Sequence, residues 1–447
     1  MDAIIAAIAD YAARFALDQT PAETVHAARR HLVDSIACGL GGHDCAAARM
    51  GRRIAATSTA PARAARSLGA RTAVAAEAAA FVSTAMIRYL DFNDTVHGGH
   101  PSDALGAVLA AADMARSDGA RLLSGMIVTY ETAARLILAA KLRERGFDQG
   151  FAIAIAAAAG AGHVLRLPPA QIAHAVSIAA VGNLPPRVTR AGELSMWKGA
   201  ATAFAARNAL FAVLLAAEGM TGPEAAFTGR HGVFEQTGGT FAPKPFGAFL
   251  TGAIGLKYWP VENGAQAAVW AALELRQKIP ISEIAQIDIA TATPIWLEIG
   301  SEPAKWDPKT RETADHSMAY IFARALADGG ITVRSFDEAA YLDAGLRPLM
   351  AKIRVAKDDA IDAVYPGRVI LRLAVRRRSG ETMAIEIENP RGHAQNKMDD
   401  GEVAQKFTAL AAPVLGNGRA ASAFERLWRI EREASVPDLF DALAIDD

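Results

Sequence analysis

Cysteine is nearly absent from this sequence. Only Cys38 and Cys45 occur among its 447 residues. Two thiols exclude an iron–sulfur cluster held by three or four thiolates of this chain. A disulfide between them is not expected in what reads as a cytosolic protein. The chemistry of this protein must therefore proceed without such a cluster.

Charge of either sign is not in excess. The 47 Lys and Arg residues against 48 Asp and Glu residues give a formal net charge of −1. This balance favours neither a nucleic acid nor a membrane surface as a partner. We find no strongly hydrophobic, uncharged run of about 18 residues, the length that spans a bilayer. The first residues carry acids and do not resemble a secretory signal. We expect a cytoplasmic protein without nucleic-acid or membrane partners.

Familiar cofactor and nucleophile motifs are also missing. The sequence has no strand–GxGxxG–helix pattern for a dinucleotide and no Walker A loop for a nucleotide phosphate. It has no GxSxG nucleophile elbow. Its Asp and His residues do not follow a familiar zinc spacing. We therefore expect neither a cofactor nor a bound metal.

What the sequence has in quantity is alanine at helical spacing. Hydrophobic residues make up 51% of the chain, and segments such as 21–40 and 192–223 are rich in alanine and leucine. Alanine is the best helix former and allows close helix packing. From about residue 280 the pattern changes to strand-like alternation, in 284–293, 368–377 and 381–390. Helical segments, 314–329 and 338–353, lie between these strands.

The chain is too long for one compact core, so two domains are expected. The sequence predicts a mainly α fold: a large all-helical domain with an inserted smaller α+β lid domain. We expect residues 1–265 to form the first part of the helical domain and 266–395 the lid. Residues 396–447 return to helical spacing and are expected to complete the helical domain.

One short stretch, the polar segment 91–103, collects polar side chains in this apolar chain. Its polar members are Asp91, Asn93, Asp94, Thr95, His97, His100, Ser102 and Asp103. Caps and turns account for some of them but not for all. Histidine titrates near neutral pH, so His100 is the best candidate for a general base. Asp91 or Asp94 could orient its imidazole. The new helix after His100 offers backbone N–H groups that could face a substrate carboxylate.

The polar segment resembles the signature of the MmgE/PrpD family. The resemblance rests on "RYLDFNDT" and "HPSDALGAVLAAAD", with three further ordered matches at 192–223, 256–272 and 309–332. The family includes 2-methylcitrate dehydratases, cis-aconitate decarboxylases and iminodisuccinate epimerases. The resemblance implies a homodimer that acts on a small di- or tricarboxylate.

The resemblance also implies site residues. The family's active-site positions fall on Asp91, Thr95 and His100 in the polar segment, with two lysines at Lys198 and Lys257. They fall further on His316 and Tyr320, which are four residues apart and are expected on one helix face. Together with Asp94 and Gln149, these residues make up the predicted site. We expect His100, Asp91, Lys198 and His316 to be catalytic, and Thr95, Asp94, Lys257, Tyr320 and Gln149 to bind substrate.

Two positions depart from the family pattern. Gln149 follows Asp148 where dehydratase-like members tend to carry a histidine, and Gly264 stands where many members carry another. Glutamine forms hydrogen bonds but carries no proton near neutral pH. The leading interpretation is a cofactor-independent hydro-lyase acting on a 2-methylcitrate-like acid. An epimerase of an amino- or imino-dicarboxylate is second and a cis-aconitate-type decarboxylase third. A helical scaffold that has lost activity is the non-enzyme alternative.

Overall fold

The computed structural model describes residues 1–57 and 63–446. The chain divides into two compact units. The first unit comprises Met1–Arg187, Gly199–Ile254 and Asp399–Asp447, and the second comprises Val188–Lys198 and Gly255–Met398. The predicted bounds differ from these in three places, because 188–198, 255–265 and 396–398 group with the second unit by their contacts.

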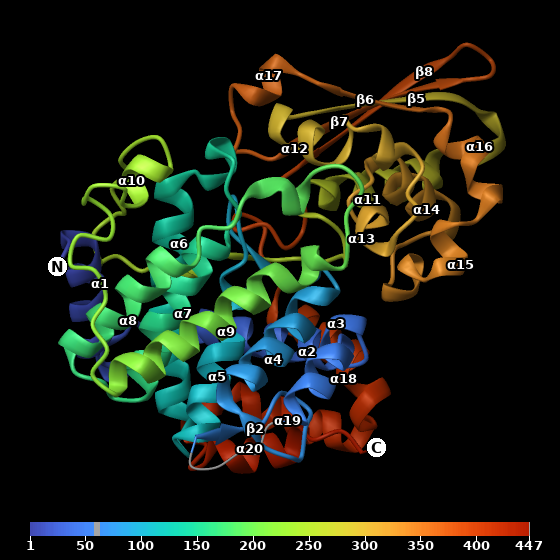
Figure 1. Ribbon diagram of the computed structural model, residues 1–447. Helices are drawn as coiled ribbons and strands as arrows, with labels where there is room; N and C mark the ends of the chain where they lie inside the picture. Colours follow the sequence, from blue (N-terminus) through green and yellow to red (C-terminus); the bar gives the residue numbers. More distant parts are fainter. Residues whose placement is uncertain (58–62, 447) are drawn as a thin grey trace. The chain divides into compact units, whose positions relative to one another are not determined.

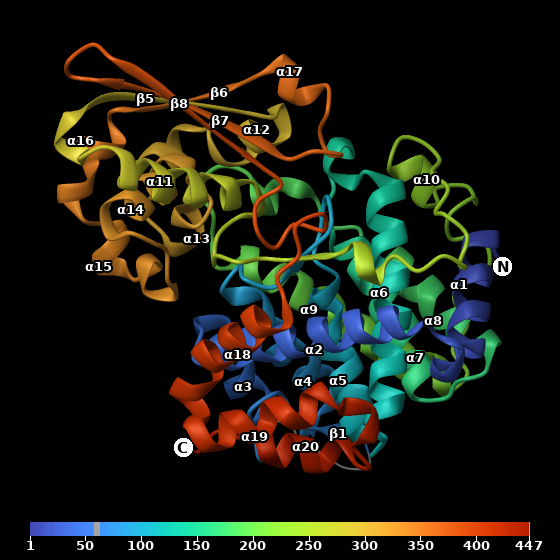
Figure 2. The same ribbon diagram turned by 180° about the vertical axis from the view of Figure 1, so that it is seen from behind.

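The first unit is built from helices. They are α1 (Ala3–Arg14), α2 (Ala22–Gly41), α3 (Ala46–Ala55), α4 (Ala76–Tyr89), α5 (Leu105–Met114), α6 (Gly119–Ala140), α7 (Gly150–Val164), α8 (Pro169–Gly182), α9 (Trp197–Ala217), α10 (Val233–Gln236), α18 (Asp400–Leu415), α19 (Asn417–Trp428) and α20 (Val436–Leu443). The first two residues of α9 belong to the second unit. The C-terminal helices pack on N-terminal ones, and α18 lies along α2 in both ribbon views (Figures 1 and 2).

Small side chains explain why these helices pack so closely. Every residue of α7 is buried, and ten of its fifteen residues are alanine or glycine. At Gly160 an added Cβ would lie 1.8 Å from Thr129 Oγ1 of α6, so only glycine permits this approach. Gln149 is the N-cap residue at the start of α7.

Among the residues that the structure describes, two helices are long and apolar enough to cross a bilayer by length and composition alone. They are α6 and α9, whose most apolar windows are 89% and 67% buried inside the structure. Core helices of a compact protein pass the same test of length and composition. Burial of this extent is what a core position requires of such a helix.

The prediction of a mainly α fold is confirmed, but the first unit is not purely helical. Short strands β1 (Ala64–Ala65) and β2 (Val74–Ala75) pair antiparallel, and β3 (Asp94–Thr95) lies in the polar segment. Two-residue strands are too short for side-chain alternation to reveal them. Cys38 and Cys45 are buried free thiols.

The second unit contains a four-stranded sheet in the order β6-β5-β7-β8. Its elements are β4 (Gly255–Leu256), α11 (Gln266–Lys278), β5 (Ile284–Thr291), α12 (Thr293–Ile299), α13 (Arg311–Ala314), α14 (Met318–Asp328), α15 (Glu338–Tyr341), α16 (Arg347–Met350), β6 (Ile353–Lys357), α17 (Asp359–Asp362), β7 (Ile370–Arg377) and β8 (Thr382–Glu388). Helices α11 and α14 cover one face of the sheet (Figure 2). Their shared core includes Leu275, Phe322 and Leu373.

The alternating segments are the strands that the sequence predicts. Strands β7 and β8 form an antiparallel hairpin, with Arg376 opposite Thr382 next to the turn. Strand β6 was not predicted, because the segment before it reads as helix as far as Ile353. It pairs parallel with β5, from Ile287 opposite Ile353 to Thr291 opposite Lys357.

Candidate active site

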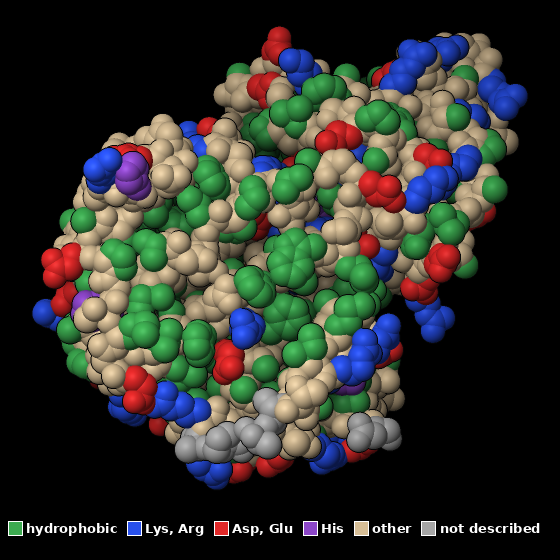
Figure 3. All heavy atoms as spheres, viewed as in Figure 1, with side chains coloured by type: hydrophobic (Ala, Val, Ile, Leu, Met, Phe, Trp, Pro, Cys, Tyr) green, Lys and Arg blue, Asp and Glu red, His purple; other side chains and the backbone are tan. Residues whose placement is uncertain are grey.

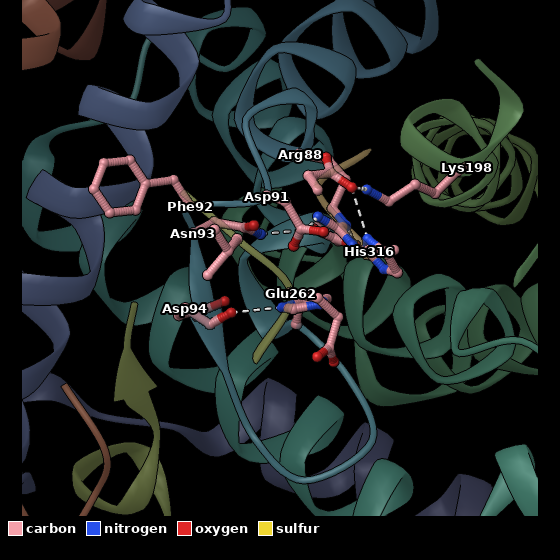
Figure 4. Close-up of polar contacts among 12 residues, drawn as sticks. Arg88, Asp91, Phe92, Asn93, Asp94, Lys198, Glu262 and His316 are labelled. Carbon is pink, nitrogen blue, oxygen red and sulfur yellow. Dashed lines mark hydrogen bonds and ion pairs between the residues drawn. The ribbon is translucent and has the colours of Figure 1, made fainter. Parts of the chain in front are cut away.

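The polar segment begins where α4 ends. Leu90 caps the helix, and Asp91 then adopts a left-handed backbone conformation with φ 49°. Aspartate tolerates this region better than most residues. The turn directs the Asp91 carboxylate back to Arg88, whose Nη1 donates to Oδ1 over 2.8 Å (Figure 4). Both side chains are buried, at 3% and 1% exposure, so the Arg88–Asp91 ion pair is shielded from water.

The imidazole of His100 is fixed by the backbone of Asp94. His100 Nδ1 lies 2.6 Å from the carbonyl oxygen of Asp94. A carbonyl oxygen can only accept, so Nδ1 carries the proton in this bond. In the neutral imidazole, Nε2 then holds the lone pair. This is the tautomer that a general base requires, and Asp94 selects it through its main chain.

The carboxylate of Asp94 points away from that imidazole into the protein. Its Oδ1 accepts from Ser102 Oγ at 2.6 Å and from Ser102 N at 3.2 Å. The side chain is completely buried, and desolvation raises the pKa of Asp94 to about 7 despite hydrogen bonds from Ser102 and Tyr130. The N–H of Ser102 therefore bonds to Asp94.

Gln149 bridges the polar segment to the start of α7. Its Oε1 accepts from the backbone N–H of His100 at 2.6 Å, and its Nε2 donates to Asp103 Oδ2 at 3.1 Å. Asp103 also accepts from Asn93 Nδ2 at 2.9 Å. An added Cβ at Gly99 would lie 2.4 Å from Gln149 Oε1, so the glycine permits this approach. Gln149 thus holds the backbone of His100 in place.

The sequence analysis did not identify Lys406, a lysine that contacts the polar segment at Phe92. Lys406 of α18 donates to the carbonyl oxygen of Phe92 at 2.7 Å and pairs with Asp34 of α2 at 2.6 Å. Its ammonium also lies 3.8 Å from the centre of the Phe92 ring. The available signal was one charge in an apolar stripe, since Val403, Lys406 and Phe407 all face inward.

The second unit holds a separate buried charge cluster. Asp315 Oδ1 accepts from Lys198 Nζ at 2.6 Å and from His316 Nδ1 at 2.7 Å (Figure 4). All three side chains are at most 4% exposed. The shared carboxylate orients the imidazole. A lysine and a histidine on one carboxylate can hold an anion and deliver a proton.

Lys198 belongs to the second unit because its own segment is tied there. Thr310 Oγ1 donates to the carbonyl oxygen of Leu194 at 3.0 Å, and Leu194 N donates to Thr313 Oγ1 at the same distance. The backbone carbonyl of Lys198 accepts from Arg190 Nη1 at 3.1 Å. These bonds set the position of the first turn of α9 relative to α13.

The predicted pairing of His316 and Tyr320 on one helix face is wrong. Helix α14 begins at Met318 with Ser317 as its cap, so His316 lies outside the helix. The hydroxyl of Tyr320 donates to the carbonyl oxygen of Ser335, and its ring packs on Phe336. Burial raises the pKa of Tyr320 to about 12. Tyr320 is thus engaged in packing α14, and we assign it no substrate contact.

The remaining predicted residues lie as follows. Thr95 is half-buried in β3, beside Asp94. Lys257 is 2% exposed and follows β4 in the second unit. Gly264 is the second residue of the 3₁₀ turn Asn263–Ala265, and its N–H donates to Glu262. An added Cβ there would lie 2.6 Å from Ile295 Cγ2. His163, a buried residue of α7, donates from Nδ1 to the carbonyl oxygen of Ala12, and burial lowers its pKa to about 4.

Two family domains match most of this chain. The MmgE/PrpD N-terminal domain matches residues 6–245, and the MmgE/PrpD C-terminal domain matches residues 259–430. A 2-methylcitrate dehydratase of Salmonella typhi is 29% identical over 89% of this chain and 87% of its own. A cis-aconitate decarboxylase-like protein of Aspergillus oryzae is 27% identical over 94% and 92%. An alkylcitrate dehydratase of a fungal species is 29% identical over 74% and 75%. The two domain matches cover most of the sequence, and the chain belongs to the MmgE/PrpD family.

Proposed function

We propose that this protein is a cofactor-independent hydro-lyase that acts on a small di- or tricarboxylate, with a 2-methylcitrate-like hydroxy acid as substrate. The observation that carries the proposal is the hydrogen bond from His100 Nδ1 to the carbonyl of Asp94, which leaves Nε2 as the basic nitrogen. Relatives named as 2-methylcitrate and alkylcitrate dehydratases support this reaction class.

The proposed reaction begins with proton abstraction. His100 Nε2 takes a proton from the carbon next to a substrate carboxylate, and the C–H electron pair becomes the new C=C bond. The neighbouring C–O bond breaks, and its electron pair leaves with the hydroxyl group. His316, whose Nδ1 is hydrogen-bonded to Asp315, supplies in its protonated form the proton that makes the leaving group water. Lys198 offsets the negative charge that develops on the carboxylate.

An epimerase of an amino- or imino-dicarboxylate is the second candidate. It is favoured by Gln149, which forms two hydrogen bonds to protein groups and cannot carry a proton. An epimerase needs one base and one acid on opposite faces of a carbon and no leaving group. The first steps of the two reactions are therefore the same, and they differ in the fate of the substituent.

One experiment separates these candidates. The protein is incubated in deuterated water with a panel of small polycarboxylates that includes 2-methylcitrate and citrate. Amino-dicarboxylates are tested in parallel. A hydro-lyase gives an unsaturated product and releases water, whereas an epimerase returns the substrate with deuterium at the inverted carbon. If no member of the panel gives a product or incorporates deuterium, both enzymatic candidates are rejected and a scaffold is favoured.

We also propose that the protein forms a homodimer, as the family resemblance implies. The support is an exposed row on α9, where Trp197, Phe204 and Phe211 recur every seven residues at 47%, 43% and 48% exposure. Hydrophobic side chains gather on the face along which α9 runs (Figure 3). Exposed aromatic clusters commonly mark protein interfaces. Light scattering should give twice the chain mass for the wild-type protein and the single chain mass for Phe204→Asp. The control Ile54→Asp changes an exposed position of α3 and should keep twice the chain mass.

A further inference from the structure

Lys305 is a buried lysine for which neither the fold nor the proposed reaction accounts. It lies in the 3₁₀ turn Pro303–Trp306 of the second unit, and its side chain is 1% exposed. Its ammonium makes no hydrogen bond within the described residues. The nearest carboxylate oxygen, Glu302 Oε2, lies 4.0 Å away. A buried ammonium has three donors, and leaving all three unused is costly.

The acids around Lys305 are engaged elsewhere. Glu302 accepts from the backbone N–H of Gly192 with both oxygens, at 3.1 and 3.0 Å. Asp315 accepts from Lys198 and from His316. The printed bonds of Glu302 and Asp315 thus go to other groups, and neither carboxylate hydrogen-bonds the Lys305 ammonium among the described residues. A bound anion could accept from the donors of this buried ammonium.

The pKa of Lys305 responds to charges of the same cluster. Burial is the largest influence on its pKa and lowers it, and Lys198 lowers it further. Glu302, Glu298 of α12 and Asp315 act in the opposite direction without offsetting the burial. Burial therefore destabilises the charged form of Lys305 more than the nearby carboxylates stabilise it.

The backbone of Lys305 is fixed next to His316. Ser317 Oγ donates to the carbonyl oxygen of Lys305, and the same Oγ accepts from Tyr320 N at 3.1 Å to cap α14. One hydroxyl therefore joins the turn of Lys305 to the residue directly after His316. Both lysines approach the turn 315–317, one from each flanking segment.

We propose that Lys305 is a second carboxylate-binding residue, which with Lys198 selects substrates that carry at least two carboxylates. This inference rests on the proposed function, because it assigns a residue to the same polycarboxylate substrate. The ammonium donates to one substrate carboxylate while Lys198 stabilises the other, which becomes electron-rich during proton abstraction. Lys305 is thus a binding residue, and no proton transfer is assigned to it.

The test uses tricarballylate, a tricarboxylate without a hydroxyl group that could leave. Calorimetric titration should show binding to the wild-type protein and at least tenfold weaker binding to Lys305→Met. Lys305→Met should also melt at a higher temperature, because an apolar side chain replaces an uncompensated buried charge. The matched control Lys309→Met removes a lysine that is 60% exposed and paired with Asp307. It should bind tricarballylate as tightly as the wild type.

A second readout separates binding by Lys305 from a structural role. A bound carboxylate raises the pKa that burial has lowered, so wild-type protein should take up protons when it binds tricarballylate in alkaline buffer. Titrations in two buffers of different ionisation enthalpy measure this uptake. Lys305→Met should show less uptake than the wild type, and Lys309→Met should not differ from it.

Three outcomes distinguish the two proposals. A folded Lys305→Met protein that binds tricarballylate within twofold of wild type and with unchanged proton uptake overturns the role of Lys305 alone. A wild-type protein that binds tricarballylate through Lys305 but exchanges no deuterium with the polycarboxylate panel overturns the proposed reaction alone. A wild-type protein that binds no tricarballylate overturns the role of Lys305 together with the tricarboxylate substrate class.

Discussion

The side-chain oxygen of Gln149 accepts a hydrogen bond from the backbone N–H of His100, 2.6 Å away. The other end of the same amide donates to Asp103 at 3.1 Å. An amide suits this position because one end accepts while the other donates. A carboxylate could replace only the first of these bonds.

Gln149→Glu should therefore place two carboxylates side by side, and one of them must keep a proton at a cost that rises with pH. The difference in melting temperature from wild type should grow between pH 5.5 and 8. Turnover should fall roughly tenfold as His100 loses its support. Gln149→Met is the matched control, since it removes both bonds without adding charge. Its melting-temperature difference should stay constant, and a pH-dependent difference there would contradict the explanation.

His100→Ala should leave the fold intact and lower turnover by roughly 100-fold or more, the usual scale for loss of a general acid or base. Circular dichroism and steady-state rates on the substrate found in the deuterium panel measure the two properties. His231→Ala is a suitable control because that histidine is 69% exposed. Full activity in a folded His100→Ala protein would show that the base is another group.

The raised pKa of Asp94 predicts a specific pH dependence of stability. The folded protein holds a proton on Asp94 up to about pH 7, whereas the unfolded chain releases it near pH 4. The free energy of unfolding therefore falls as pH rises between these values. Asp94→Asn removes this contribution and keeps an acceptor for Ser102. Its melting temperature relative to wild type should increase from pH 5 to pH 8, while Asp44→Asn, at an exposed residue, should show no such trend.

Gly264 tests whether a side chain can be introduced at this turn. Gly264→Ala should lower the free energy of unfolding by about 1–3 kcal/mol, because its Cβ would lie 2.6 Å from Ile295 Cγ2. Adding Ile295→Ala removes the clash, so the double variant should lose less stability than the sum of the single variants. Gly418→Ala is the control, since an added Cβ there meets no atom within 4 Å. Additive effects in the double variant would place the strain elsewhere.

Metal removal gives a further prediction. Turnover should survive extensive dialysis against a chelator, because the acid–base steps assigned to His100 and His316 need no Lewis acid. Rates before and after dialysis are compared on the same protein sample. Activity lost to the chelator and restored by a single divalent ion would show that the reaction needs a metal.

The sequence predicts most of the local structure because periodicity reports which face of an element is buried. The helical half follows from alanine and leucine spacing, and β5, β7 and β8 follow from alternation. Strand β6 escapes this reasoning, since its five residues follow a helix-like run and owe their conformation to parallel pairing with β5. Pairing between segments far apart in sequence is not visible in local patterns.

The sequence likewise indicates some residues of the candidate site and not others. The polar segment is evident from composition alone, and the family pattern points to Lys198 and His316. The contacts of Lys406 with Asp34 and Phe92 join segments from opposite ends of the chain, so its place in an apolar stripe marks it as buried but does not identify its partners. The error at Tyr320 arose because spacing of four residues implies a shared face only when both residues are helical.

The contact of Lys406 with Asp34 also has a consequence for biosynthesis. The ribosome synthesises α2 and the polar segment well before α18. Asp34 and the carbonyl oxygen of Phe92 therefore have no contact with Lys406 until α18 has been made. Until then, the α2 surface that α18 covers stays exposed on the nascent chain. The contacts of Lys406 with Asp34 and Phe92 thus form only after α18 has been synthesised, and a chain that ends before α18 carries the polar segment without them.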